Sequence, residues 1–245
     1  LIKFGKFNYL SSGFLDYMTE YYNKDLEKSD SRRELNSMKV GYASQMKIYT
    51  EYNGSKIKIN TTETVSSISG STSSIFFEGF SDRSFVLSHY DVVAGRYPEN
   101  KNQVALVISE KNTISEQALT SMGIEFSKTT NDKGEVVYNN LEFERDIVGK
   151  TYKLVTNDTY YVPDDLTSPT TFSENTDIEA MYVADDTQEL VISGVLRLKE
   201  EVNSALLDEG IMYLPSLATT YRANCRNSLI ARKTIELAEE DWSYN

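Results

Sequence analysis

The sequence predicts an α+β fold in which mixed or antiparallel sheets pack against helices, and three patterns indicate it. Residues 14–38 carry apolar side chains at three- and four-residue spacing, which is typical of an amphipathic helix. Residues 40–60 alternate between larger apolar and smaller or polar side chains on both sides of Asn53-Gly54, a dipeptide typical of hairpin turns. Residues 104–108 (VALVI) and 190–198 (LVISGVLRL) are strongly apolar runs of strand length, and the first predicts a strand buried on both faces.

Composition limits the classes of function. A chain of 245 residues with 40% hydrophobic residues is long enough for one large domain or for two lobes. The formal net charge of −12 argues against nucleic-acid backbones or anionic lipid headgroups as the main partner. The single cysteine, Cys225, excludes an intrachain disulfide and a cysteine-rich zinc site. No apolar run approaches the roughly 18 residues of a membrane span, so we expect this stretch of chain to be soluble.

Turn and cap residues divide the first half of the chain into further elements. Residues 29–31 (SDS) are expected to break the first helical stretch into two helices. The Ser/Thr-rich residues 61–74 predict a loop or a loosely held edge before a short strand at 75–77. The turn GRYPEN at 95–100, in which Gly95 can take a positive φ, leads into the buried strand. Residues 115–122 predict a short helix that ends at Gly123.

The middle of the chain is more polar. The turn Asp132-Lys133-Gly134 precedes a short strand at 136–138. Residues 150–155 and 159–162 predict a second hairpin around Asn157-Asp158. Residues 163–186 hold two prolines and many acids, which favours a solvated excursion with at most one short helix.

The last part of the chain predicts a strand followed by a long helix. In the apolar strand at 190–198, Gly194 is expected at a bulge or at a point of close packing. Residues 210–214 predict a further strand, and Pro215 then occupies the first turn of a helix that reaches at least Ala231. The inner face of this helix is expected to carry four side chains: Leu217, Tyr221, Leu229 and Ile235.

Two segments carry a family resemblance. Residues 90–110 (YDVVAGRYPENKNQVALVISE) and 189–198 (ELVISGVLRL) resemble the extracellular domains of FtsX/MacB-like ABC transporter permeases, particularly those of Gram-positive bacteria. The resemblance implies a two-lobed MacB-like extracytoplasmic domain, the periplasmic core domain of that family. A porter-like lobe would then comprise residues 38–98 plus 205–235, an inserted, sabre-like lobe residues 99–204, and residues 1–37 a helical segment leading from the membrane. The segments 96–102 and 199–205 would be the hinges between the lobes.

The same resemblance implies a function without catalysis. Such a domain lies on the extracellular side of the cell membrane and transmits ATP-driven motion, so that a peptide or lipid substrate or a partner protein is engaged or exported. Its partners would be the cognate ABC ATPase, the transmembrane helices of the same permease and an extracellular peptide, lipid or protein, with no nucleic acid. No catalytic, cofactor-binding or metal-binding residue is expected. Two alternatives stay open: a secreted surface hydrolase that uses carboxylates, and a free-standing adhesin or binding protein.

The candidate catalytic motifs are incomplete. Gly149-Lys150-Thr151 resembles the end of a phosphate-binding loop, but the glycine required five positions earlier is replaced by Glu144, whose charge would repel phosphate. His89 is the only histidine, so a Ser-His-Asp hydrolase would need it together with Asp91 or Asp82, and no G-x-S-x-G motif is present. We therefore interpret both motifs as structural.

Acid pairs and the cysteine give weaker signals. Asp164-Asp165, Asp185-Asp186 and residues 239–241 (EED) lack the spacing of a calcium loop, although a glycosidase pair assembled in three dimensions stays open. Cys225 lies near Arg222 and Arg226, which can lower the pKa of a thiol, but a small buried hydrophobic role is more common.

Overall fold

The computed structural model describes residues 12–35, 37–39, 45–61, 64–65, 72–73, 75–134, 136–138, 141–167 and 169–243. The chain divides into two compact units, Leu1–Val40 and Gly41–Asn245. Among the described residues, no helix is both long enough and apolar enough to cross a membrane.

The first unit contains helix α1 (Ser12–Leu26) and the single 3₁₀ turn η1 (Asp30–Arg32). The carboxylate of Asp25, which is 1% exposed, accepts hydrogen bonds from the backbone N–H groups of Glu34 and Leu35. Lys28 forms an ion pair with the same carboxylate at 2.8 Å. These contacts fold residues 28–35 back onto the end of α1. The predicted break at residues 29–31 is confirmed, but the second helix is only this one turn.

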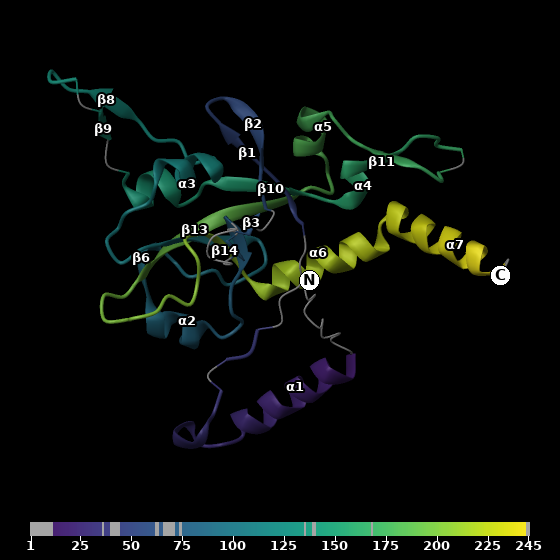
Figure 1. Cartoon of the computed structure of the whole chain (residues 1–245). Coiled ribbons are helices and arrows are strands. Elements are labelled where there is room, and N and C mark those ends of the chain that lie inside the picture. Colours follow the sequence, from purple (N-terminus) through teal and green to yellow (C-terminus); the bar gives the residue numbers. More distant parts are fainter. Residues whose placement is uncertain are drawn as a thin grey trace, which may run out of the picture. The chain divides into compact units, whose positions relative to one another are not determined.

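The second unit is built on an eight-stranded mixed sheet with the strand order β2-β1-β10-β13-β7-β14-β5, in which β6 also pairs with β13 (Figure 1). The predicted α+β class is therefore confirmed. The strands of this sheet are β1 (Lys47–Tyr52), β2 (Ser55–Ile59), β5 (Phe76–Glu78), β6 (Tyr90–Gly95), β7 (Gln103–Ile108), β10 (Thr151–Val155), β13 (Gln188–Leu198) and β14 (Gly210–Tyr213). Three two-stranded ribbons complete the strands: β3 (Thr64–Val65) with β4 (Thr72–Ser73), β8 (Lys128–Thr130) with β9 (Val136–Tyr138), and β11 (Tyr161–Pro163) with β12 (Phe172–Glu174).

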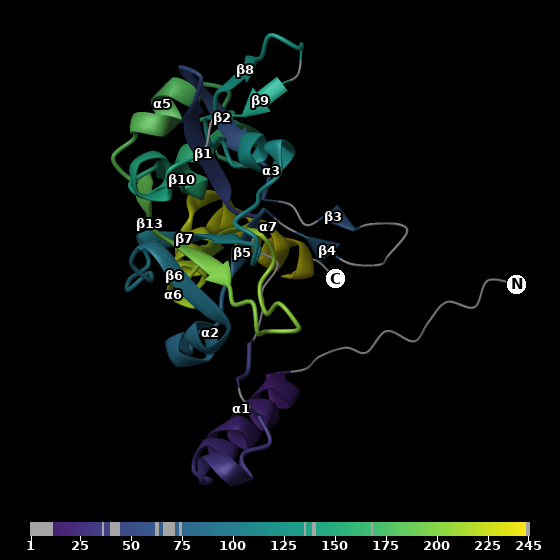
Figure 2. The same cartoon turned by 90° about the vertical axis from the view of Figure 1, so that its left-hand side faces the viewer.

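Helices cover both faces of the sheet. On one face, side chains near α3 (Glu116–Ser121) and on α6 (Pro215–Asn227) complete the largest apolar cluster of the described chain. On the other face, α2 (Arg83–His89) covers one end of the sheet, and α4 (Asn157–Tyr160) and α5 (Ile178–Val183) cover the other. Figure 2 shows α3 and α5 on opposite sides of β1 and β2.

The strongest sequence signals gave the correct elements. The hairpin of β1 and β2 turns at Asn53 (φ 50°) and Gly54 (φ 71°), the left-handed pair that a two-residue turn requires. Strand β7 is buried at every position because its side chains alternate between the two apolar clusters. Helix α3 begins after the Ser115 cap, and Gly123 follows it with φ 64°.

The turn at residues 95–100, which we call the organising turn, begins at a close contact between two glycines. Gly95 has φ 60° and lies opposite Gly194 in the register of β6 and β13. A Cβ atom on Gly95 would lie 2.2 Å from the carbonyl oxygen of Ser193, and one on Gly194 would lie 2.3 Å from that of Arg96. Both predicted roles, a positive φ at Gly95 and close packing at Gly194, are confirmed.

The predicted second hairpin is wrong. Residues 150–155 and 159–162 do not form a hairpin, because the hydroxyl of Thr156 accepts a hydrogen bond from the N–H of Thr159 and begins α4 instead. β10 pairs with β1 and β13, and β11 pairs with β12.

The long C-terminal helix is also interrupted. It breaks at Ser228, whose ψ of 155° leaves the helical region, and α7 (Leu229–Ser243) then begins. Leu217 and Tyr221 are buried as predicted, whereas Ile235 is 51% exposed. The expectation that Ile235 lines an inner face is therefore wrong.

The expected hinge segment 96–102 runs beside the first half of β13, whereas 199–205 follows the end of this strand. The carbonyl oxygen of Asn102 accepts a hydrogen bond from the N–H of Val191 near the start of this strand. Lys199 follows the end of the strand, and its N–H donates to the carbonyl oxygen of His89. Strands from both expected lobes share the sheet, since β7, β10 and β13 fall within 99–204 and lie between β1 and β14. The assignment of 96–102 and 199–205 as hinges and the lobe boundaries both stay predictions.

Candidate functional site

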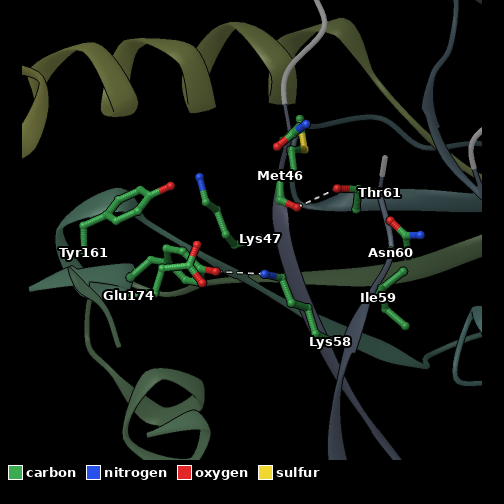
Figure 3. A pocket seen from close by; sticks show the side chains of 10 residues that line it. Met46, Lys47, Lys58, Ile59, Asn60, Thr61, Tyr161 and Glu174 are labelled. Atoms are coloured by element: carbon green, nitrogen blue, oxygen red, sulfur yellow. Dashed lines mark hydrogen bonds between the residues drawn. The ribbon is translucent and has the colours of Figure 1, made fainter. Parts of the chain in front are cut away.

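A hollow of about 300 Å³ opens where β1 begins and β2 ends, beside the start of β11 (Figure 3). Its walls combine two ammonium groups, two phenols, one carboxylate and several amide and hydroxyl groups. They come from Gln45, Met46, Lys47, Lys58, Ile59, Asn60, Thr61, Tyr160, Tyr161 and Glu174. In a chain with a net charge of −12, a hollow with two lysines and one glutamate is locally positive.

Strand alternation and a helix cap bring these groups together. Lys47 and Tyr49 lie two positions apart on β1 and so share a face, and Lys58 of β2 is the direct partner of Tyr49. Tyr160, the last residue of α4, lies beneath both lysines. The cap at Thr156, which the sequence reasoning did not weigh, thus places the central phenol of the hollow.

Tyr160 links one lysine to the carboxylate. Its hydroxyl accepts a hydrogen bond from Lys58 Nζ at 2.9 Å and is bonded in turn to the Glu174 side chain. Burial, followed by this carboxylate, raises the pKa of Tyr160 to about 12. Tyr160 is therefore protonated at neutral pH, and its hydroxyl bridges Lys58 and Glu174 by hydrogen bonds.

Lys47 forms no ion pair with a described residue, and its direct contacts are uncharged, although Glu174 and Lys58 act on its charge from a longer distance. Its Nζ atom donates to the Asn157 side-chain oxygen at 3.2 Å and lies 5.2 and 5.0 Å from the ring centres of Tyr160 and Tyr161. Burial lowers the pKa of this ammonium group. Figure 3 shows Tyr161 extending toward Lys47, and Lys58 extending toward Glu174.

Two neighbouring lysines on the same face are neutralised. Lys56 of β2 and Lys153 of β10 both lie over the ring of Tyr182. Lys56 forms an ion pair with Glu179, and Lys153 forms one with Glu189 at 2.9 Å. In the part of the chain that the structure describes, Lys47 and Lys58 form no such ion pair, which distinguishes the hollow from the rest of this face.

The residues of the incomplete phosphate loop have structural partners. The Lys150 ammonium donates to the Glu51 carbonyl oxygen at 3.1 Å, and Gly149 N–H donates to the carbonyl oxygen of Ile192. Glu144 accepts the N–H of Gly95 at 2.8 Å. Glu144, which replaces the glycine that a phosphate-binding loop requires, thus stabilises the turn at residues 95–100.

His89 and the two aspartates are not assembled into a triad. His89 Nδ1 lies 2.8 Å from Ser88 Oγ and 3.3 Å from the Phe85 carbonyl oxygen. Asp82 caps α2, and Asp91 lies within 4.0 Å of Arg197 and Lys199. Each aspartate therefore has a partner other than His89.

The acid pairs and Cys225 are likewise used locally. Asp164 accepts from the hydroxyl of Ser173 at 2.6 Å, and Asp186 accepts from Thr159. Of the residues 239–241, the side chains of 240 and 241 lie outside the described part of the chain. Among the described residues, no three His, Cys, Asp or Glu side chains are grouped so that they could hold a metal ion. Burial raises the pKa of the Cys225 thiol, which opposes the thiolate form.

Comparisons with protein-family models, with curated proteins and with solved structures found no match. The geometry of the hollow is therefore the main guide to a ligand.

Proposed function

We propose that this chain is a non-catalytic extracellular domain of an FtsX/MacB-type ABC transporter permease. In this proposal, ATP hydrolysis inside the cell moves the domain, which then engages an extracellular peptide, lipid or partner protein. The two segments that resemble this family, 90–110 and 189–198, contribute β6, β7 and β13, and β13 pairs with both β6 and β7 in the sheet. The local structural partners of Lys150, His89 and Asp91 support the absence of catalysis.

The observation that carries the proposal is that α6 and the start of α7 lie beside the chain just before β1. The hydroxyl of Tyr221 in α6 donates to the carbonyl oxygen of Gln45, just before β1, at 3.2 Å. The first N–H of α7, on Leu229, donates to Asp158 at 2.7 Å, next to the Asn157 that binds Lys47 of β1. A domain inserted between two membrane helices needs this arrangement, because both of its ends return to the same membrane surface.

Surface labelling of the full-length protein tests the proposal. Asn100 is exposed in the loop before β7, so a cysteine there, in a Cys225→Ala background, would be open to solvent. In intact cells, Asn100→Cys should react with a membrane-impermeant maleimide, and the protein should co-purify with an ATPase from detergent extracts. The Cys225→Ala protein is the matched unlabelled control.

Three outcomes would contradict the proposal. Labelling only after lysis would place the domain inside the cell. Recovery of the protein free in the medium would favour the free-standing binding protein. Membrane protein that labels from outside but never associates with an ATPase would refute the transporter assignment.

A further inference from the structure

The unbalanced charge of the hollow is the feature that the proposed function leaves unexplained. Transferring an ammonium group from water into a partly buried site costs free energy unless an anion lies beside it. On this face of the sheet, Lys56 and Lys153 have their glutamates, whereas Lys47 is half-buried with an amide oxygen and two aromatic rings as its partners. The wall of the hollow carries two ammonium groups and a single carboxylate, that of Glu174, so one positive charge is left for the anion of a ligand to balance.

We propose that the hollow binds the carboxylate of a small amino-carboxylate ligand, either a free amino acid or the C-terminal end of a peptide. The ammonium group of Lys47 holds the carboxylate, and Lys58 contributes a second positive charge. This inference does not depend on the proposed function, because it rests on the contacts of these side chains alone.

Glu174 selects the charge type of the ligand. Its exposed carboxylate lies on the wall of the hollow and is bonded to Tyr160. A doubly charged phosphate would meet this negative charge, whereas a ligand with an ammonium group beside its carboxylate gains an ion pair with it. The combination of Lys47, Lys58 and Glu174 therefore favours a zwitterion over a dianion.

The size of the hollow agrees with a small ligand. A volume of about 300 Å³ lies at the lower limit for ligand pockets, which admits an amino acid or one or two residues of a peptide end. The ring of Tyr161 and the side chain of Ile59 provide apolar wall for the rest of the ligand.

Titrations of the folded chain with four probes test the ligand class. Chemical-shift changes in NMR spectra should saturate for alanine and for trialanine with a dissociation constant of about 1 mM or tighter. Trialanine amide, which lacks the carboxylate, and inorganic phosphate should each bind at least about fivefold more weakly. Equal binding of the amide or tighter binding of phosphate would overturn the ligand class. The absence of saturable shifts for alanine and trialanine at about 20 mM would overturn the site.

Variants locate the binding. Lys47→Gln should weaken alanine binding at least about fivefold, and Lys47→Arg should restore most of it. Lys56→Gln removes a neighbouring ammonium group that is already paired, and it should leave binding within about twofold. Circular-dichroism melts check that each variant is folded. A loss of affinity in Lys56→Gln equal to that in Lys47→Gln would show a general charge effect and refute the site.

A second variant keeps the test independent of Lys47. Glu174→Gln should strengthen the binding of N-acetylalanine, which carries a single negative charge, and weaken that of alanine. If both ligands change in the same direction, Glu174 does not contact the ammonium group and the zwitterion assignment is wrong.

Discussion

Substitution of Gly95 should destabilise the protein through two separable effects. The first is backbone strain, since a residue with a Cβ atom at positive φ loses about 1–2 kcal/mol. The second is overlap, because the new Cβ atom would lie 2.2 Å from the Ser193 carbonyl oxygen, and such overpacking costs about 1–3 kcal/mol. Gly95→Ala should therefore lower the free energy of unfolding by about 2–5 kcal/mol.

The chain offers a matched control for each effect. Gly54 has φ 71° and no atom within 4 Å of an added Cβ, so Gly54→Ala measures the strain alone. Gly194 has an ordinary φ, but its added Cβ would lie 2.3 Å from the Arg96 carbonyl oxygen, so Gly194→Ala measures the overlap alone. Gly95→Ala should cost more than either control.

Urea denaturation followed by circular dichroism gives the three free energies, and thermal melts provide a second measure. For a chain of this size, each kcal/mol lowers Tm by about 2–4 °C. If Gly95→Ala is no more destabilising than Gly54→Ala, the contact with β13 does not restrict this turn, and the reasoning fails.

Three further predictions concern the Glu144 contact, the buried phenol of Tyr97, and the residues Lys150 and His89. Glu144→Ala should lower the free energy of unfolding by about 1 kcal/mol, because Gly95 N–H loses its acceptor, while Glu144→Gln should retain most of it in the same urea assay. Burial raises the pKa of Tyr97 to about 12, so the unfolded chain ionises near pH 10 before the folded one, and stability falls as pH rises between those values. Tyr97→Phe removes a buried hydroxyl that has no hydrogen-bond partner among the described residues. It should reduce that loss by up to about 3 kcal/mol, and an unchanged alkaline loss would contradict this. Calorimetric titrations with ATP-magnesium and with zinc should be flat, and micromolar binding lost in Lys150→Ala or His89→Ala would contradict the non-catalytic proposal.

Local signals were enough wherever neighbouring residues decide the structure. The Asn53-Gly54 turn needs only its own left-handed backbone, and β7 needs only its unbroken apolar run. Asn157-Asp158 failed as a turn signal because the same residue types also begin helices, and the Thr156 cap decided between the two. Ser228 was missed because a serine inside a helical pattern gives no sign that its backbone will extend.

The candidate site could not be read from the sequence. Lys47, Lys58, Tyr160 and Glu174 come from four elements, and their grouping depends on the β1 pairing with β10 and on the unexpected α4. The alternation of Lys47 with Tyr49 and of Lys56 with Lys58 was visible, but it indicates only a shared strand face. Which lysines lack carboxylate partners is decided by α5 and β13, which supply Glu179 and Glu189.

The strand order of the sheet also has a consequence for when the protein can fold. Within the eight-stranded sheet, only β1 and β2 pair as neighbours in the sequence. β5 can pair with β14 only once the chain has been synthesised past residue 210. Gly95 and Gly194, which are in contact, are separated by almost a hundred residues of sequence. Pairings between such distant segments form slowly, and they leave apolar strands such as β7 exposed until the late strands emerge from the ribosome. The apolar run that organises the finished sheet is thus the segment that most needs protection during synthesis.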